Sequence, residues 1–278
     1  MNILGVTLAG NKMSKYTDQS YLKSEQYKDA TNLNARILVH ERFSENKQGW
    51  ASWVFDTYEK LPTPAKVLEL ASGSAFIWTS CPERIPADWQ ITLSDLSPGM
   101  LATVQENLAS VEHEFTYREI DAQSIPFDDE AFDIVIANHM LYHVPDRPKA
   151  LAEIRRVLKS DGILIAATNG DNHLLEMNKW LQTANPDPAF TPMGNPFTLE
   201  NGLAQLEPFF SSIEIARYKD SLHITDLNLM MAYINSVITV KGFSSADIPE
   251  VKAELENLLA TNGEIFIRKD SGIFKAVK

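Results

Sequence analysis

The sequence has one cysteine, Cys81, and few basic residues. A single thiol cannot form a disulfide within the chain or a zinc site built on several cysteines, and it is typical of a reducing compartment. We therefore expect a cytoplasmic protein. The 25 lysines and arginines stand against 37 aspartates and glutamates, a net charge of −12, and no basic cluster is longer than a pair. This distribution argues against a nucleic-acid partner.

Long apolar runs are also missing. No stretch approaches the ~20 residues that span a membrane. The segment MNILGVTLAG at the start is too short for a signal peptide and lacks its basic beginning. Met13 is a second possible start, which would make residues 1–12 a disordered extension. With 44% hydrophobic and 22% charged residues, the chain has the composition of a globular protein with one large α/β domain or two small ones.

Glycine is scarce in the segment VLELASGSAFIW, residues 67–78, where the pattern indicates a strand, a tight turn and a helix. Many α/β proteins hold a nucleotide over such a turn, usually with three glycines. Here only Gly73 is present, and Ala71 and Ala75 occupy the other two places. We expect Gly73 to permit the close approach of a ligand and both alanines to have negative φ. Losing two glycines favours a nucleoside without a pyrophosphate.

Strand and helix patterns alternate through the middle of the chain, which predicts a mostly parallel sheet with helices on both faces. The expected strands are 66–70, 90–94, 114–120, 131–137 and 162–168, and the expected helices include 32–43, 50–60, 100–108 and 148–158. KSDGIL, at 159–164, is expected to be a turn. Beyond it we expect a loop at 185–197, a strand at 211–217, helices at 227–240 and 249–260, and two short β segments around Asp270-Ser271-Gly272.

Acidic residues follow three of the expected strands. Glu69 ends the first strand, Asp95 follows the second and Asp121 follows the third, at equal separations of about one β-α unit. The carboxyl ends of parallel strands meet at one edge of a sheet, so these three carboxylates should line the same site. Carboxylates accept hydrogen bonds from ribose hydroxyls and from an adenine amino group, and they favour a cation nearby. The alternative for each acid is helix capping or a solvated loop.

With these features the chain resembles the class I S-adenosylmethionine-dependent methyltransferases, and most of all the small-molecule enzymes of ubiquinone and menaquinone biosynthesis. The matching segments are VLELASGSA, LSDLSPGML, IDAQSIPFDDEAFDIVIANHMLYHVPD and ALAEIRRVLKSDGILIAAT. The resemblance implies a doubly wound, mostly parallel seven-stranded sheet with a Rossmann-like fold. It also implies an N-terminal arm with lid helices at 1–60 and a methyltransferase domain at 61–278, with a helical insertion at about 222–262.

The resemblance implies S-adenosylmethionine as cofactor and a site made of residues that follow the first four strands. The methionine part would be held by Glu69, Ala71, Ser72 and Gly73, and the ribose and the adjacent adenine by Asp95, Leu96 and Met100. The adenine would also contact Asp121 and Ala122, and the sulfonium side would face Asn138 and His139. For Met100, a core position on the second helix is an equal alternative. Amino-methyltransferases of DNA carry an Asn/Asp-Pro-Pro-aromatic turn after the fourth strand, where this chain has NHML.

Methyl transfer from a sulfonium is an in-line displacement, which needs a base only when the acceptor is protonated. The segment after the fourth strand offers His143 as the first choice of base and Tyr142 as an orienting residue, with His40 as a third candidate. The alternatives are a bond from His143 to a backbone carbonyl and a structural His40. No metal is expected, because His139 and His143 have no third ligand nearby and Pro145 disrupts a helix there.

The acceptor is expected to be small and at least partly apolar, in a cavity bounded by residues 27–53, 138–146 and 185–240. Three other functions remain open at this point. They are a nicotinamide dehydrogenase, against which the missing glycines argue, a catalytically silent S-adenosylmethionine-binding protein, and an enzyme that uses the same cofactor for another reaction.

Overall fold

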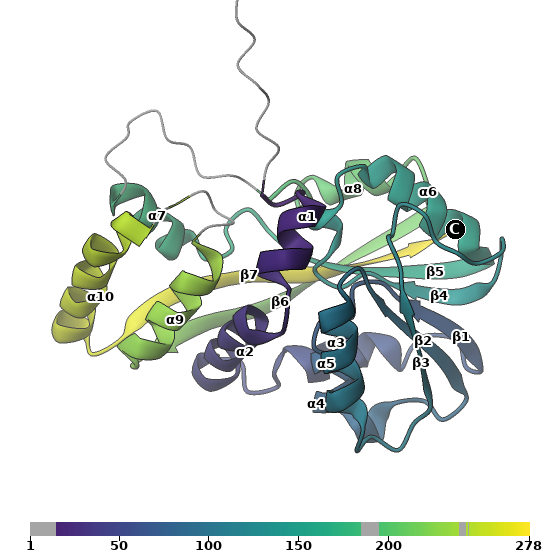
Figure 1. The fold of residues 1–278 in the computed structure, drawn as a ribbon, viewed down its shortest axis with the longest axis horizontal. Coiled ribbons are helices and arrows are strands. Elements are labelled where there is room, and N and C mark those ends of the chain that lie inside the picture. Colours follow the sequence, from purple (N-terminus) through teal and green to yellow (C-terminus); the bar gives the residue numbers. More distant parts are fainter. Residues whose placement is uncertain (1–14, 185–194, 239–242, 244) are drawn as a thin grey trace, which may run out of the picture.

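The computed structural model describes residues 15–184, 195–238, 243 and 245–278, and its centre is one seven-stranded sheet (Figure 1). The strands are β1 (Ala65–Glu69), β2 (Trp89–Asp95), β3 (Phe115–Glu119), β4 (Phe132–Ile136), β5 (Leu158–Asn169), β6 (Ser212–Ile224) and β7 (Ile265–Val277). Their order in the sheet is β3-β2-β1-β4-β5-β7-β6. Strands β1 to β5 are parallel, and β7 is antiparallel to both of its neighbours. The predicted fold class is confirmed.

Helices cover both faces of the parallel part of the sheet. Successive side chains of a strand point to opposite faces, so adjacent apolar residues of one strand are buried by helices on opposite sides. Val67 packs in one apolar cluster with the helices α3 (Trp50–Tyr58), α4 (Phe76–Ser80) and α5 (Pro98–Leu108). Its neighbour Leu68 packs in a second cluster with α6 (Arg147–Val157) and α8 (Gly202–Leu206). The carboxyl ends of β1, β2 and β3 lie together at one edge of the sheet.

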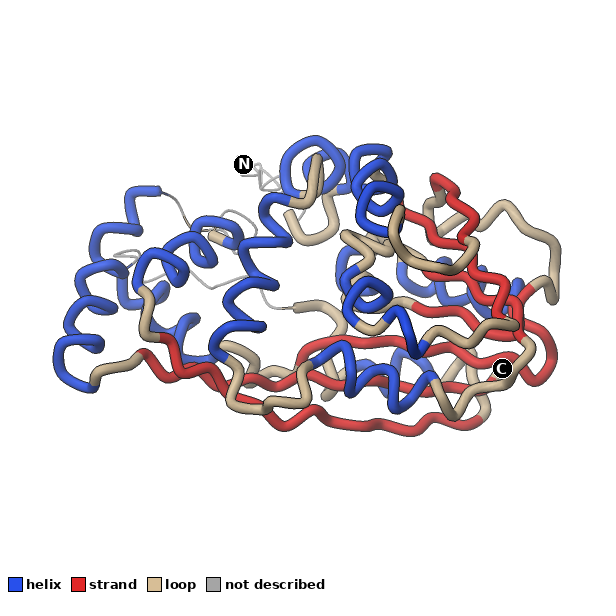
Figure 2. The backbone as a smooth tube through the Cα atoms, turned by 90° about the horizontal axis from the view of Figure 1, so that it is seen from below, coloured by secondary structure: helices blue, strands red, loops and turns tan. Residues whose placement is uncertain are grey.

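The strands β6 and β7 extend beyond the parallel sheet into a helical subdomain, which we define as α7 (Leu175–Ala184), α9 (Leu227–Val237) and α10 (Ile248–Asn262). These helices cover one side of the long strands (Figure 2). Ile265 and Ile267 are buried against them, whereas Phe266 faces away and is 46% exposed. Helix α2 (Thr31–Phe43) packs on α9 and β6 and joins the subdomain to the sheet.

One predicted break between strands is wrong, whereas the predicted turn at 159–164 survives inside β5, which begins at Leu158. A Cβ on Gly162 would lie 3.0 Å from the backbone N and O of Lys159, so the chain folds back locally there. Phe132 pairs with Leu158 and Ile134 with Ile163, so the extra residues of β5 are accommodated as a local irregularity in the ladder. The break predicted in β7 is the wrong one, because the strand continues through Ser271 and Gly272. Its backbone pairs on both sides, with β5 and β6, and that pairing overrides the local turn signal.

The remaining elements are short and belong to the N-terminal arm or to connections. They are α1 (Gln19–Tyr21), a single π-helical turn (Leu22–Gln26), and the 3₁₀ turns Pro82–Arg84, Leu141–His143 and Ser245–Asp247. Within the described part of the chain, no helix has the length and apolar character to cross a membrane.

Candidate active site

A cavity of about 1190 Å³ opens at the carboxyl ends of β1, β2 and β3 and extends beneath α2 and the helical subdomain. Every residue predicted for the cofactor or for catalysis lines it. The predicted walls at 27–53 and 138–146 contribute to its lining, and so does α9. Residues 185–194, 239 and 240 of the third predicted wall lie outside the described residues.

The turn after β1 has an unexpected backbone. Ala71, Gly73 and Ala75 all have positive φ, at 54°, 60° and 59°. The expectation of negative φ at the two alanines is therefore wrong. Contacts with β2 hold the turn in place, since Ser72 N donates to Ser94 O at 2.8 Å and Ser72 Oγ accepts from Ser94 N at 3.1 Å. The alanines thus keep the left-handed geometry of glycines, at a conformational cost of roughly 1–2 kcal/mol each.

Replacing Ala71 by glycine is expected to raise the free energy of unfolding by about 0.5–1 kcal/mol, because glycine adopts positive φ without strain. The matched control is Ala102→Gly on α5, an exposed helical position where glycine should cost about 1 kcal/mol. Urea unfolding of both variants measures the two effects. A loss of stability in Ala71→Gly as large as that in Ala102→Gly would contradict the left-handed turn.

Glu69 is buried beneath the turn. Trp78 Nε1 donates to its Oε2 at 2.6 Å, and Asn138 Nδ2 lies 3.4 Å from its Oε1. Burial raises the pKa of Glu69 to about 7, although these hydrogen bonds oppose the shift. Trp78 and Tyr58, which accepts from Asn138 Nδ2 at 2.8 Å, were not predicted as site residues. Both side chains are buried in the core, and their positions in the sequence follow the pattern of core residues. That pattern gives no sign that they hydrogen-bond to Glu69 and Asn138.

Asp95, at the end of β2, accepts hydrogen bonds from the turns that follow β1 and β2. Gly73 N donates to its Oδ2 at 3.2 Å and Ser97 N to its Oδ1 at 2.9 Å. Burial raises the pKa of Asp95 to about 6 against these hydrogen bonds. The N-cap of α5 is Ser97, whose Oγ accepts from Met100 N at 3.3 Å. Asp95 is therefore not the helix cap, and its carboxylate lines the cavity.

From the raised pKa values of Glu69 and Asp95 we expect that the affinity for a cationic ligand with hydroxyl donors, such as S-adenosylmethionine, depends on pH. Their folded pKa values lie above the ordinary ones, so stability from their protonated forms is lost as pH rises through about 6 to 7. The ligand favours the ionised forms, so the increase in Tm that it causes should grow between pH 5.5 and 8. Thermal melts with and without ligand test this, and an increase in Tm that is independent of pH would contradict it.

The N-terminal arm covers the end of β3. Gln19 Nε2 donates to Asp121 Oδ2 at 3.2 Å, and Lys23 pairs with Glu119 at 2.7 Å. Burial raises the pKa of Asp121, but hydrogen bonds from Gln123 and Gln19 outweigh it and leave the pKa below its usual value. Asp121 is thus set to remain ionised beneath the arm. On α2, Leu33 lies directly over the turn, where a Cβ on Gly73 would be 3.1 Å from its Cδ2.

His143 has a fixed tautomer. Its Nδ1 lies 2.7 Å from the carbonyl oxygen of Tyr16, which can only accept, so Nδ1 carries the proton. Its Nε2 lies 3.0 Å from the Tyr27 hydroxyl, which must then donate. Burial lowers the pKa of His143 to about 4, and it is neutral at pH 7. Tyr142, packed edge-on at 4.5 Å, has a pKa raised well above its usual value by burial.

The other two predicted histidines lie deeper in the cavity. His40 has its Nε2 3.5 Å from the Tyr233 hydroxyl, while its Nδ1 has no partner among the described residues. Burial lowers the pKa of His40 well below its usual value. His139 follows β4 at a positive φ of 52°, with its ring 5.3 Å from that of Trp50, and burial lowers its pKa to about 4. No group of acids, histidines or cysteines in the described ranges is arranged to hold a metal ion.

Several lining residues were missed because they come from segments distant in the sequence. They are Tyr16, Tyr27, His173, Tyr233 and Lys269. No local pattern singles out these residues, since they come from the arm, from α9, from β7 and from the connection between β5 and α7, and only the tertiary structure brings them to the cavity.

Comparison with known proteins matches residues 68–166 to the family described as a methyltransferase domain. Residues 68–166 therefore carry a methyltransferase domain. Among curated relatives, the C-methyltransferase UbiE of ubiquinone and menaquinone biosynthesis from Xanthomonas oryzae is 32% identical over 117 residues, covering 41% of this chain and 46% of that protein. The mitochondrial arginine-hydroxylase NDUFAF5 of Mus musculus is 38% identical over 88 residues, covering 31% of this chain and 26% of that protein. The predicted resemblance is confirmed.

Solved structures share the fold of this chain. Phosphoethanolamine N-methyltransferase 2 of Haemonchus contortus, in complex with phosphomonomethylethanolamine and S-adenosylhomocysteine, matches with a TM-score of 0.58 and 19% identity. The match covers 94% of this chain and 60% of that one, and at this identity it shows a shared fold. The chain spans about half the length of the UbiE protein that it matches.

Proposed function

We propose that the chain transfers a methyl group from S-adenosylmethionine to a small-molecule acceptor. The observation that carries the proposal is one cavity that joins the carboxylates at the strand ends to an aromatic space beneath α2 and α9. The methyltransferase domain covers β1 to β5, which supply the acids. The similar UbiE protein is named as a C-methyltransferase, and the similar Haemonchus enzyme is in complex with S-adenosylhomocysteine.

The cofactor end of the cavity fits the chemistry of S-adenosylmethionine. Asp95 would accept hydrogen bonds from the ribose hydroxyls, and Asp121 from the adenine amino group. Glu69 would lie near the cationic methionine part, and its ionised form would be favoured by that charge. Main-chain groups of the turn around Gly73 complete this end. When bound, the cofactor would supply an electrophilic methyl group on a sulfonium.

The acceptor end is largely aromatic, with Tyr16, Tyr27, Tyr142, Tyr233 and Trp50 among its lining residues. This supports a small, partly apolar acceptor. Helix α2 would act as a lid, because Leu33 covers the turn while other residues on the same helix line the acceptor space. A cover of this kind excludes water and aligns the acceptor atom with the methyl carbon and sulfur.

His143 would accept the proton that a phenol or ammonium acceptor loses during transfer. Its Nε2 is the basic nitrogen, because Nδ1 already donates to the Tyr16 carbonyl. The proton would reach Nε2 through the Tyr27 hydroxyl, which accepts from the acceptor as it donates to the imidazole. Hydrogen bonding from Nδ1 to the carbonyl stabilises the imidazolium that forms and offsets part of the burial that holds its pKa low.

Calorimetry with the purified full chain tests the cofactor. S-adenosylmethionine and S-adenosylhomocysteine are expected to bind with low-micromolar Kd or tighter, about −8 kcal/mol. NAD should bind far more weakly, because the turn lacks the glycines that admit a pyrophosphate. Tight binding of NAD without a response to the other two ligands would overturn the proposal.

A second candidate is an S-adenosylmethionine-binding protein with a reaction other than methyl transfer, or with no reaction. It is favoured by the relative NDUFAF5, which is 38% identical over 88 residues and is named as an arginine-hydroxylase. Release of S-adenosylhomocysteine in the presence of a library of acceptors separates the two candidates. Tight cofactor binding without any such release supports the second one.

A further inference from the structure

The two ends of the cavity differ in their charged side chains. At the cofactor end the lining includes the carboxylates Glu69, Asp95 and Asp121. Beneath α2 and the helical subdomain the lining includes the cations Arg36 and Lys269 together with histidines, and also the carboxylates Glu41 and Asp171, neither of which lies within ion-pairing distance of Arg36. Since the proposed cofactor is cationic, the carboxylates at the strand ends are accounted for, and the unpaired Arg36 concerns the acceptor.

Among the described residues, Arg36 has no counter-charge. Its Nη1 lies 3.3 Å from the Ser236 carbonyl oxygen and its Nη2 lies 3.5 Å from the Tyr27 hydroxyl, both at the long limit of a hydrogen bond. None of the carboxylates in the described part of the chain lies within ion-pairing distance of it. By contrast, Arg84 pairs with Asp56 at 2.9 Å and with Glu59 at 2.8 Å. Most donors of the Arg36 guanidinium are therefore available to a ligand.

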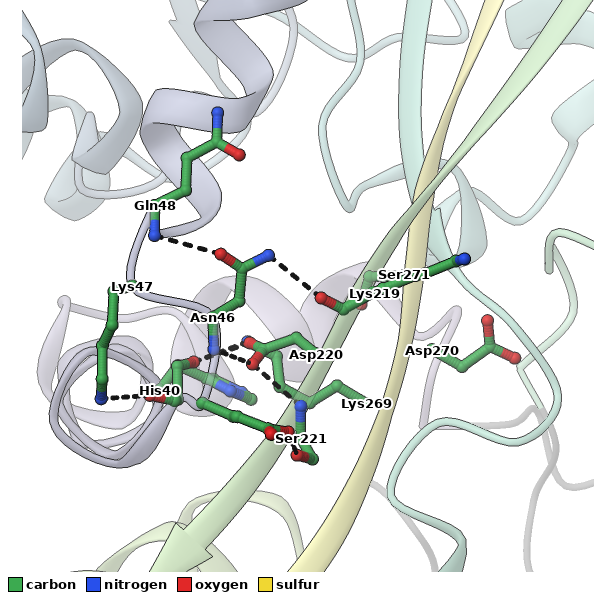
Figure 3. Close-up of polar contacts among 12 residues, drawn as sticks. His40, Asn46, Lys47, Gln48, Lys219, Asp220, Ser221, Lys269, Asp270 and Ser271 are labelled. Atoms are coloured by element: carbon green, nitrogen blue, oxygen red, sulfur yellow. Dashed lines mark hydrogen bonds and ion pairs between the residues drawn. The ribbon is translucent and has the colours of Figure 1, made fainter.

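The other cations that line the cavity are occupied or exposed. Lys269 is paired with the buried Asp220 and donates to Ser44 Oγ at 3.1 Å, at the junction of the α2–α3 loop with β6 and β7 (Figure 3). Lys23 is paired with Glu119. Lys47 is exposed and donates to the Ser44 carbonyl oxygen at 2.8 Å. One half-buried positive charge, that of Arg36, thus remains uncompensated within the described lining.

The groups around Arg36 are neutral and cannot supply the missing anion. Burial raises the pKa of Tyr16 to about 12 and the pKa of Tyr142 well above its usual value, although the charge of Arg36 opposes both shifts. Burial lowers the pKa values of His40 and His143, and Arg36 lowers them further. A partly buried cation among neutral groups is unfavourable unless an anion binds to it.

We propose that Arg36 binds a carboxylate of the acceptor, and that this contact selects aromatic or otherwise apolar carboxylic acids as substrates. The planar guanidinium matches a carboxylate in a two-point contact. One free cation balances one negative charge, whereas a phosphate dianion would need a second. The aromatic side chains of Tyr27, Tyr233 and Trp50 provide the wall for the apolar body. This inference rests on the proposed function, since it assigns the acceptor class of the same site.

The test uses matched ligands and the full chain saturated with S-adenosylhomocysteine. The probes are two acid–amide pairs, benzoate with benzamide and 2-naphthoate with 2-naphthamide, and in addition 2-naphthyl phosphate. Their binding is measured by ligand-observed NMR and by calorimetry. Wild-type protein is expected to bind the carboxylates about tenfold more tightly than the amides. Arg36→Gln should remove that preference, and Arg36→Lys should retain part of it as a point charge. The control is Arg42→Gln, an exposed position on the same helix, which should change nothing.

The affinity for S-adenosylhomocysteine separates the possible failures. Unchanged affinity in Arg36→Gln shows that the variant is folded and that its defect concerns the acceptor end. Equal binding of carboxylates and amides by wild-type protein, or a preference that survives in Arg36→Gln, overturns the role of Arg36. Tighter binding of the phosphate than of 2-naphthoate overturns the assignment to a carboxylate. A wild-type chain that binds no S-adenosylhomocysteine refutes the proposed function itself.

Discussion

Replacing His143 by alanine is expected to lower kcat about 100-fold, a typical contribution of general-base catalysis. The cofactor Kd should change less than threefold, because His143 contacts the arm residues Tyr16 and Tyr27 and not the acids at the strand ends. The measurement is the rate of S-adenosylhomocysteine formation with an acceptor found by screening. His223→Ala is the matched control, since this histidine pairs with Glu264 at 2.8 Å in the outer part of β6.

The variant Tyr27→Phe distinguishes a base from a mere support of the arm. It removes the hydroxyl that donates to His143 and keeps the ring. If the proton passes through this hydroxyl, kcat should fall for protonated acceptors while KM changes little. The opposite outcome is a rise in KM or in the cofactor Kd for His143→Ala and Tyr27→Phe, with kcat unchanged. It would show that His143 and Tyr27 only hold the arm over the site.

Replacing Asp95 by alanine is expected to weaken cofactor binding at least tenfold. Charge-assisted hydrogen bonds to the ribose hydroxyls contribute about 1.5–3 kcal/mol, which corresponds to a loss of between tenfold and 200-fold. Asp95→Asn keeps one acceptor oxygen and should retain part of the affinity. Calorimetry with S-adenosylhomocysteine measures the loss, and Asp88→Ala at an exposed position just before β2 is the control.

Asp95 also has a structural role, which must be separated from its expected role in cofactor binding. The carboxylate also accepts from Gly73 N and Ser97 N, so the variant will lose some stability whatever the ligand. A lower Tm combined with unchanged affinity would mean that Asp95 only supports the turn. The same experiment on Asp121→Ala should show a smaller loss of affinity, because Gln19 and Gln123 already occupy its oxygens.

The parallel strands and the positions of the acids along the chain were predictable because both depend on local patterns. Short segments with apolar residues at Val67 and Leu68 form β1, and those at Ile91 and Leu93 form β2. Parallel strands end at one edge of a sheet, so Glu69, Asp95 and Asp121 had to lie near one another. The N-terminal helix predicted at 32–43 agrees within one residue with α2, since its end at Phe43 is marked by a change in pattern.

Only the tertiary structure decided the features that depend on partners distant in the sequence. Ala71 and Ala75 take left-handed backbones because contacts with β2 hold their turn, and no local preference of alanine predicts this. Strand β7 runs through Ser271 and Gly272 because two neighbouring strands pair with it along that stretch. The shifted pKa values of Glu69 and His143 arise from burial under other elements. The helix that carries Arg36 was predicted from the sequence, but only the packing of the described residues leaves its guanidinium without an ion-pair partner among them.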